Sequence, residues 1–449
     1  MKVIFKNGKI LNETFEKESS SQEIKDINMV IEELKSKKEY IHSLKIDWII
    51  EFFNEISRYW IGNKELETKV GTLKHLADFF TKENTTSMLN FALRGDYKIL
   101  DNFIDLNQIK YVYHCQPRGL VVQWLSGNVP LLGLYSIFMA MLTKNVSLIK
   151  ASSKAYKELL ILLESLNNVN TEYIKGSEFL ETITVVLVDN NDTKTHNEMS
   201  SSADVRVAWG GHEAIQTIIN LKKDVFCEDI VFGPKYSYGV IDKEALVDYK
   251  KIAQRLAFDI CTFDQQACSS PHTIFVEENN QTSAVVFAEE LAKNIDFITK
   301  KMLPKENEGA QKKLEILTQR AKYSMMEETR DIKDIESTKD SKVFSSENTD
   351  WTVICSNEEG LYNACFSRVI HVKPIDNISK LKQYNDKKKQ TLGIALNKQN
   401  RKEIINEITL NGIDRCPRFG DMTLFESPWD GMFPIDRLER WVALSKKRD

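Results

Sequence analysis

The chain has 449 residues, a formal net charge of −4 at pH 7, 42% hydrophobic residues and 28% charged residues. This composition fits a soluble globular protein, and the length is sufficient for two domains. A charge so close to neutral provides no overall electrostatic attraction to nucleic acid or anionic membranes. We therefore expect no nucleic-acid partner, and any phosphate site must be local.

The N-terminus and the cysteines indicate a cytoplasmic protein. The first twenty residues contain neither the apolar core nor the cleavage signal of a secretory peptide. The longest nearly uncharged apolar run, Val129 to Leu142, is too short to span a bilayer and reads as a buried helix. The seven cysteines form no CxxC pair, which favours a reducing compartment over a disulfide framework or a zinc site. We expect no membrane span and no metal.

The first half of the chain predicts helices followed by an α/β unit. Residues 20 to about 100 carry apolar side chains at helical spacing. From about residue 119, buried strands are expected at 120–125, 146–150, 184–188 and 205–209, and helices at 129–143, 153–166 and 213–219. Strands that alternate with helices predict a parallel sheet covered by helices on both faces.

A second α/β unit follows Phe232-Gly233-Pro234. Strands are expected at 239–241, 273–276, 369–372, 392–396 and 413–414, helices at 243–258 and 283–298, and exposed helix and loop at 301–350. The fold class is therefore α/β. We predict a helical N-terminal region plus a nucleotide-binding domain at 1–235, a catalytic domain at 236–416 and a C-terminal return segment at 417–449.

Cys268 is the residue best suited to chemistry. It ends the segment Phe263-Asp264-Gln265-Gln266-Ala267-Cys268, on a loop just after a predicted helix. A cysteine held on such a loop can form a thiolate, which attacks carbonyl carbon; the alternative is a small buried hydrophobe. His272 could be its base, although an ordinary core or surface histidine is the commoner case. Pro271 also extends the chain between them and should point the two side chains apart.

Asn128 is a candidate oxyanion donor. It lies in Ser126-Gly127-Asn128-Val129-Pro130, directly after a buried strand. A side-chain amide at this place can donate a hydrogen bond to a developing oxyanion. It can also cap the following helix, and the two roles are compatible.

Two turns after strands are candidate phosphate sites. Lys150-Ala151-Ser152-Ser153 and Gly210-Gly211-His212 both stand at helix starts, where backbone N–H groups and the helix dipole favour anions. The alternatives are a capped helix with a surface lysine and a simple tight turn. A GxGxxG motif is absent from the sequence, so a standard Rossmann phosphate loop is excluded. Together on one sheet edge, the two turns favour a dinucleotide.

Six segments occur in a characteristic order and approximate spacing: 125–131, 142–145, 149–153, 207–211, 232–235 and 263–268. Together they resemble the long-chain acyl-CoA reductase (fatty-acid reductase) family of bacterial bioluminescence operons, a branch of the aldehyde dehydrogenase superfamily. The likeness runs from about residue 115 to Trp441 and includes Trp429-Asp430-Gly431-Met432. The resemblance implies an aldehyde-dehydrogenase-like fold of two doubly wound domains, with a cofactor crevice between them.

The resemblance also implies roles for particular residues. Cys268 corresponds to the acyl-accepting nucleophile and Asn128 to the oxyanion donor. The lysine of the superfamily contacts the adenosine ribose or its 2′-phosphate, so Lys150 favours NADPH, with NADH possible. The implied cofactor-binding residues are Ser126, Lys150, Ser152, Ser153, Gly210, Gly211, Gly233, Phe366 and Arg368.

One departure from the superfamily pattern indicates the direction of the reaction. Hydrolytic aldehyde dehydrogenases carry a glutamate before a Gly-Gly pair where this chain has Phe232-Gly233-Pro234. A reductase must keep its acyl-enzyme from water until hydride arrives, so the missing base favours NADPH-dependent reduction of a fatty acyl thioester to a fatty aldehyde. The alternatives are a hydrolytic aldehyde dehydrogenase and an acyl-relay subunit.

The resemblance further implies partners. The acyl donor is a fatty acyl-CoA or an acylated protein. The family works in a complex with acyl-activating and acyl-transferring subunits, and the superfamily leads us to expect a homo-oligomer.

Overall fold

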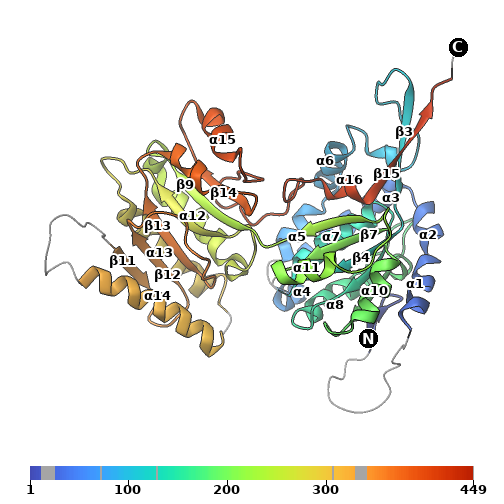
Figure 1. Ribbon diagram of the computed structural model, residues 1–449, viewed down its shortest axis with the longest axis horizontal. Coiled ribbons are helices and arrows are strands. Elements are labelled where there is room, and N and C mark those ends of the chain that lie inside the picture. Colours follow the sequence, from blue (N-terminus) through green and yellow to red (C-terminus); the bar gives the residue numbers. More distant parts are fainter. Residues whose placement is uncertain (12–25, 71–72, 128–129, 306–307, 329–340, 448–449) are drawn as a thin grey trace. The chain divides into compact units, whose positions relative to one another are not determined.

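The structure, a computed structural model, describes residues 1–11, 26–70, 73–127, 130–305, 308–328 and 341–447. The chain divides into two compact units, shown in Figure 1. Unit 1 comprises Met1–Gly233 and Phe425–Asp449, and unit 2 comprises Pro234–Leu424. The chain thus returns to unit 1 at Phe425, later than the residue 417 expected from the sequence.

Unit 1 is built on a seven-stranded sheet in the order β2-β1-β6-β5-β4-β7-β8. Its strands are β1 (Lys2–Lys6), β2 (Lys9–Ile10), β4 (Leu120–Trp124), β5 (Val146–Lys150), β6 (Ile183–Leu187), β7 (Val205–Trp209) and β8 (Glu228–Phe232). The strands β4 to β8 are mutually parallel, and β1 runs antiparallel to β6. The four parallel strands expected here are confirmed, whereas β1, β2 and β8 were not predicted.

The helices of unit 1 cover this sheet. They are α1 (Ile27–Lys35), α2 (Lys38–Ser43), α3 (Ile46–Ile61), α4 (Lys64–Lys69), α5 (Leu73–Phe79), α6 (Lys82–Ala92), α7 (Pro130–Leu142), α8 (Tyr156–Ser165), α9 (Gly176–Phe179), α10 (Thr193–Ser201), α11 (His212–Ile219) and α16 (Pro434–Leu438), with 3-10 turns η1 (Tyr97–Leu100), η2 (Leu166–Asn168) and η3 (Leu180–Thr182). The ring of Phe138 on α7 packs against Phe53 and Trp60 on α3. The N-terminal helical region is therefore part of the core of unit 1.

Two further strands lie outside this sheet. β3 (Tyr111–Pro117) and β15 (Glu439–Ser445) pair antiparallel and form a ribbon of their own, visible in Figure 1. The pairing ties the returning end of the chain to unit 1.

The strand order of unit 1 creates a place for a ligand. The chain moves from β4 to β5 and β6 in one direction, and then returns to the other side of β4 with β7 and β8. Open α/β sheets bind ligands at the carboxyl ends of their strands where the order reverses. In unit 1 this edge carries the residues that directly follow β4, β5, β7 and β8.

Unit 2 contains a six-stranded sheet in the order β11-β12-β13-β10-β9-β14. Its strands are β9 (Tyr236–Ile241), β10 (Pro271–Val276), β11 (Ser341–Ser345), β12 (Thr352–Ser356), β13 (Val369–Pro374) and β14 (Lys389–Ala395), of which only β11 is antiparallel. The strands expected at β9, β10, β13 and β14 are confirmed. The strand expected at 413–414 is wrong, because Ile413 has a φ of +73° and the neighbouring Arg415 makes a single bridge to Thr391.

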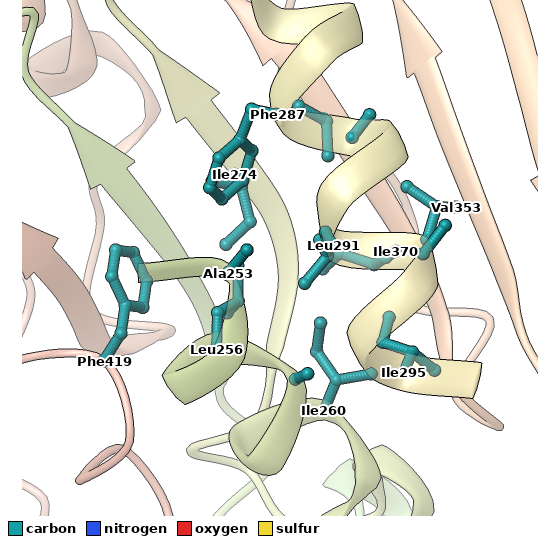
Figure 2. Close-up of a cluster of buried hydrophobic side chains, with 14 of the residues drawn as sticks. Ala253, Leu256, Ile260, Ile274, Phe287, Leu291, Ile295, Val353, Ile370 and Phe419 are labelled. Atoms are coloured by element: carbon teal, nitrogen blue, oxygen red, sulfur yellow. The ribbon is translucent and has the colours of Figure 1, made fainter. Parts of the chain in front are cut away.

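Helices lie on both faces of the unit 2 sheet. They are α12 (Tyr249–Cys261), α13 (Ala284–Lys301), α14 (Ala310–Glu328) and α15 (Arg401–Thr409), with 3-10 turns η4 (Ala245–Asp248), η5 (Thr262–Gln265) and η7 (Ile378–Tyr384). Figure 2 shows the core on one face, where Leu256 and Ile260 of α12 and Leu291 of α13 meet strand residues such as Ile274 and Ile370. Smaller apolar clusters beneath η7, α15 and α14 fill the opposite face.

Two helix boundaries differ from the predictions. The helix expected at 153–166 begins only at Tyr156, because residues 152–155 form a turn closed by the Ala155 N–H and the Ser152 carbonyl at 3.3 Å. The helix expected at 243–258 begins at Tyr249, after the short turn η4. Within the described ranges, no helix has both the length and the apolar character that crossing a membrane requires.

Candidate active site

Cys268 lies in the turn between η5 and β10, at the amino ends of the parallel strands of unit 2, and is half-buried. The Ser237 hydroxyl on β9 donates to the Cys268 main-chain carbonyl at 2.6 Å. The same hydroxyl accepts from the Thr391 N–H on β14 at 3.1 Å. The backbone of the cysteine is thereby tied to two strands of the sheet.

The other six cysteines are poor nucleophiles. Cys115, Cys227, Cys261, Cys355 and Cys365 are buried, and Cys416 is half-buried like Cys268. Burial raises the thiol pKa to about 11 in Cys227 and Cys261, to about 12 in Cys355, Cys365 and Cys416, and further still in Cys115. Reactive cysteines need partial exposure and access to the thiolate, which leaves Cys268 and Cys416, and the raised pKa of Cys416 argues against that residue.

His272 is buried on β10, and its ring packs between Tyr236 and Phe366 at centroid distances of 5.4 and 5.2 Å. Burial lowers the pKa of His272 to about 4, so the imidazole is uncharged and a weak proton acceptor at neutral pH. The structure therefore does not favour His272 as the base for Cys268.

The turn before Cys268 has an uncommon backbone. Phe263, Asp264 and Gln265 have φ values of +56°, +48° and +62°, and residues 366–368 form a second such run at +57°, +59° and +60°. The two runs contact each other, because the Ser367 N–H donates to the Asp264 carbonyl at 2.9 Å. Three consecutive residues other than glycine in the left-handed region are unfavourable unless the surroundings fix them.

Arg368 is the last residue of the second left-handed run, and it is 1% exposed. Its Nε donates to Asp264 Oδ1 at 2.6 Å, and its Nη1 donates to Thr299 Oγ1 on α13 at 2.7 Å. A guanidinium so buried has almost no surface to offer a cofactor, and the predicted place of Arg368 in the cofactor site stays a prediction. Phe366 is half-buried beside His272, and its predicted place near a nicotinamide stays a prediction.

In unit 1, the predicted nucleotide residues follow neighbouring strands. Ser126 comes after β4, Lys150 is the last residue of β5, and Ser152 and Ser153 form the next turn. The loops after β4 and β5 approach so closely that a Cβ on Gly127 would lie 2.6 Å from Ser152 Oγ. Asn128 lies outside the described residues, so its role as oxyanion donor stays a prediction.

Lys150 is held at the sheet edge. Its Nζ donates to Asn190 Oδ1 at 3.0 Å, and burial lowers its pKa although the Asp189 carboxylate opposes this. The loop carrying Asp189 and Asn190 is anchored by His196, whose Nε2 lies 3.2 Å from the Asp189 carbonyl. Trp124 Nε1 donates to His196 Nδ1 at 3.1 Å, and because an indole can only donate, Nδ1 is the unprotonated nitrogen.

The turn after β7 leaves room for an anion. Gly211 is the N-cap of α11 and provides no capping side chain. A Cβ added to Gly211 or Gly233 would meet no atom within 4 Å, so neither glycine is required by internal packing. Trp209 stacks on Phe232 at 3.9 Å, and its buried Nε1 has no hydrogen-bond partner in the described part of the chain. Open space at the N-terminus of α11 fits a dinucleotide phosphate. Among the described residues, no three His, Cys, Asp or Glu side chains gather as they would around a metal ion.

Several site residues had no signal in the sequence. Ser237, Thr299, Trp124 and His196 act through contacts with residues far along the chain. The sequence shows Asp264 only as a member of the segment that contains Cys268. Its ion pair with a residue 104 positions away becomes visible only in three dimensions.

Comparisons with known proteins agree with this geometry. The family described as acyl-CoA reductase (LuxC) matches residues 21–441. A long-chain acyl-protein thioester reductase of Aliivibrio fischeri is 27% identical over 423 residues, which is 89% of this chain and 82% of that protein. Long-chain acyl-protein thioester reductase 2 of Photobacterium leiognathi is 28% identical over 429 residues, covering 90% and 83% of the two chains.

Solved structures show the same fold at low identity. Aldehyde dehydrogenase 21 of Physcomitrella patens superposes with a TM-score of 0.66 at 12% identity, covering 99% of this chain and 98% of that one. An NADP-dependent glyceraldehyde-3-phosphate dehydrogenase of Bacillus halodurans, solved with NADP, gives a TM-score of 0.64 at 13% identity and covers 99% of each chain. The expected aldehyde-dehydrogenase-like α/β fold is confirmed.

Proposed function

The chain belongs to the acyl-CoA reductase (LuxC) family, and we propose that it reduces a long-chain acyl thioester to the fatty aldehyde with Cys268 as nucleophile and NADPH as hydride donor. The carrying observation is the contrast among the cysteines. Cys268 is half-buried on a turn whose carbonyl accepts from Ser237, whereas five of the other cysteines are buried and burial raises the thiol pKa of the sixth, Cys416, to about 12.

The first half-reaction is acyl transfer. The Cys268 thiolate forms a bond to the thioester carbon, the carbonyl oxygen becomes an oxyanion, and the bond to the donor sulfur then breaks. The departing thiolate takes up a proton, and the acyl group remains on Cys268 as a new thioester. Asn128 and a main-chain N–H are the proposed oxyanion donors, in line with the resemblance. Covalent capture replaces one difficult reduction with two easier steps.

The cofactor residues of unit 1 are proposed to be Ser126, Lys150, Ser152, Ser153, Gly210, Gly211 and Gly233. When bound, a reduced nicotinamide supplies hydride to the acyl carbon, and release of the aldehyde regenerates the Cys268 thiolate. The preference for NADPH rests on the turn 150–155, which carries two lysines and two serines and no carboxylate, while the Asp189 carboxylate near Lys150 keeps NADH as the alternative. A site selective for NAD normally offers an acidic residue to the ribose hydroxyl.

Hydrolysis of the acyl-enzyme is disfavoured by the segment between the two units. Residues 230–235 contain no carboxylate, and Phe232 stacks on Trp209 at 3.9 Å. No side chain of this segment can activate water as a general base, so the acyl group is kept for reduction. This observation argues against a hydrolytic aldehyde dehydrogenase.

The acyl donor is proposed to be a fatty acyl-CoA or an acylated partner protein, since the related enzymes are named for acyl-protein thioesters. We also propose work in the cytoplasm, as a homo-oligomer and in a complex with acyl-activating and acyl-transferring subunits. A pure acyl-relay subunit is the second candidate, because Cys268 could pass its acyl group onward without redox chemistry.

The test is NADPH oxidation in the presence of hexadecanoyl-CoA, with the product captured by a carbonyl reagent. The proposal predicts one fatty aldehyde for each NADPH consumed. Free fatty acid formed from added aldehyde and NADP would instead indicate a hydrolytic dehydrogenase. Thioester cleavage without NADPH oxidation would support the relay subunit.

A further inference from the structure

We propose that the buried ion pair between Arg368 and Asp264 positions the Cys268 turn for attack on the acyl thioester. This inference rests on the proposed role of Cys268 as nucleophile. It assigns Arg368 to the support of the cysteine, whereas the family resemblance suggested a contact with the cofactor.

The turn needs support because its backbone is unfavourable by itself. α12 ends at Cys261, and the three residues Phe263–Gln265 then adopt left-handed conformations without a glycine among them. L-residues avoid this region, because Cβ approaches the carbonyl oxygen too closely. Such a conformation persists only where surrounding contacts determine it, and it is frequent at functional sites.

The contacts that hold this backbone come from the second left-handed run and from the strands β10 and β13. The Ser367 N–H donates to the Asp264 carbonyl at 2.9 Å, and Gln265 Nε2 donates to the carbonyls of Pro271 and Val369 at 2.8 and 3.2 Å. Gln265 is fully buried. The segments before and after Cys268 are therefore held by hydrogen bonds to each other, through Gln265 and Pro271, and to Val369 on β13.

Arg368 adds the charged part of this support. Its guanidinium joins the Asp264 carboxylate of the turn to the Thr299 hydroxyl of α13, at 2.6 and 2.7 Å. The Arg368 side chain is 2% exposed and that of Asp264 is 24% exposed, so water screens the pair only weakly. Arg368 itself is held through its carbonyl, which accepts from the Thr352 N–H at 2.9 Å.

The Arg368–Asp264 ion pair lies close along the chain to the proposed nucleophile, Cys268. Asp264 and Cys268 belong to one short segment, and Ser237 fixes the other side of that segment at the Cys268 carbonyl. An attacking sulfur must reach the thioester carbon within a narrow range of distance and direction, and a displacement of about 1 Å can slow reaction about a hundredfold. Loss of the ion pair releases Asp264, and the residues between Asp264 and Cys268 are then held less firmly.

The experiment compares Arg368→Met, Arg368→Lys and Asp264→Asn with Arg206→Met in the full-length protein. Arg206 is a matched control in unit 1, because it is a buried arginine whose Nε donates to Asp229 Oδ1 at 2.6 Å. Single-turnover acylation by hexadecanoyl-CoA, NADPH binding by fluorescence, and the pH profile of Cys268 alkylation by iodoacetamide are measured for each variant.

We expect Arg368→Met to slow acylation about a hundredfold, with NADPH affinity unchanged and partial recovery in Arg368→Lys. Arg206→Met should acylate like the wild type. The alkylation profiles add a signature that a purely structural role does not produce. Arg368→Met leaves the Asp264 carboxylate without this partner and should raise the apparent thiol pKa, whereas Asp264→Asn leaves the Arg368 cation and should lower it. The charge of Lys305, which also acts on both residues, is present in every variant.

Two results would overturn the inference. Wild-type acylation by folded Arg368→Met and Asp264→Asn would remove the positioning role, and weakened NADPH binding with normal acylation would restore the cofactor role of Arg368. If Arg368→Met does not fold, Asp264→Asn decides, because it keeps the shape of the side chain and changes only its charge. The variant Cys268→Ser distinguishes failure of this inference from failure of the proposed function. If the proposed role of Cys268 is wrong, Cys268→Ser still forms aldehyde.

Discussion

The hydroxyl of Ser237 donates a 2.6 Å hydrogen bond to the main-chain carbonyl of Cys268. Ser237 is fully buried on β9, between β10 and β14 of the unit 2 sheet, and its oxygen also accepts from Thr391 on β14. The backbone of the proposed nucleophile is thus attached to two hydrogen-bonded strands of this sheet. Catalytic groups supported in this way keep their geometry between turnovers.

Replacing Ser237 by Ala should loosen this attachment. The Cys268 carbonyl and the Thr391 N–H both lose a partner, so we expect a loss of about 1–2 kcal/mol in unfolding free energy and an acylation rate about tenfold lower. Stopped-flow acylation and denaturant unfolding measure the two effects. Ser165→Ala removes a buried hydroxyl that accepts from Trp60 Nε1 at 2.9 Å in unit 1, and it should cost stability without slowing acylation. An equal slowing in both variants would contradict the account.

Lys150→Met should weaken the binding of NADPH more than that of NADH. The lysine is half-buried at the end of β5 and faces the loop that carries Asn190. Loss of one charge-assisted contact with a 2′-phosphate corresponds to an affinity about tenfold lower or more. Titration of protein fluorescence with each cofactor measures the effect, with Lys157→Met on the exposed face of α8 as control. Parallel losses for both cofactors would assign Lys150 to the ribose instead.

Gly211→Ala should separate binding from stability. Its added Cβ meets no atom within 4 Å, whereas a Cβ on Gly176 in the same unit would lie 1.9 Å from the Leu166 carbonyl oxygen. We therefore expect Gly211→Ala to unfold like the wild type and to bind NADPH about tenfold more weakly, because the methyl group enters the space kept for phosphate. Gly176→Ala should lower the melting temperature clearly. Unchanged NADPH affinity in Gly211→Ala would move the phosphate site elsewhere.

Asp259 should make stability depend on pH. This fully buried carboxyl on α12 accepts from the Gly420 N–H at 2.6 Å and the Met422 N–H at 3.0 Å, and burial raises its pKa from 3.8 to about 8. The folded protein retains a proton that the unfolded chain releases, so the stabilisation is complete below pH 3.8 and is lost as the pH rises through about 8.

Asp259→Asn removes this titration at the cost of one hydrogen bond. The variant should be less stable than the wild type at pH 5, and the difference should shrink or reverse by pH 9, since each pKa unit corresponds to about 1.4 kcal/mol. Urea unfolding at both pH values measures it. A difference that does not change with pH would show that Asp259 titrates alike in the folded and unfolded chain.

Local patterns were enough for much of the fold. Short runs of consecutive apolar residues are enough to predict a buried strand. The strands β4, β5, β7 and β13 could therefore be located from the sequence. The strand β12 was missed because its run follows a charge-dense region, and β1 because its pairing with the edge of β6 depends on tertiary contact.

For the candidate site, the sequence offers residue types and the structure adds contacts. Cys268 and the turns after β5 and β7 carry residue types whose chemistry can be proposed from the sequence alone, and their roles stay predictions. The pairing of Asp264 with Arg368 depends on two left-handed runs that lie far apart along the chain. Neither run contains a glycine, so the sequence gives no sign of the left-handed conformation. Arg368 was therefore assigned to the cofactor from the resemblance, and its burial in the ion pair with Asp264 is the basis for the proposal that it supports the cysteine turn.

The most direct test of the account is mass spectrometry of the protein mixed with hexadecanoyl-CoA in the absence of NADPH. The account predicts one acyl group per chain, mapped to the peptide containing Cys268, which disappears on addition of NADPH as an equal amount of aldehyde forms. Absence of the adduct, its location on another thiol such as the half-buried Cys416, or its failure to discharge with NADPH would contradict the central claim.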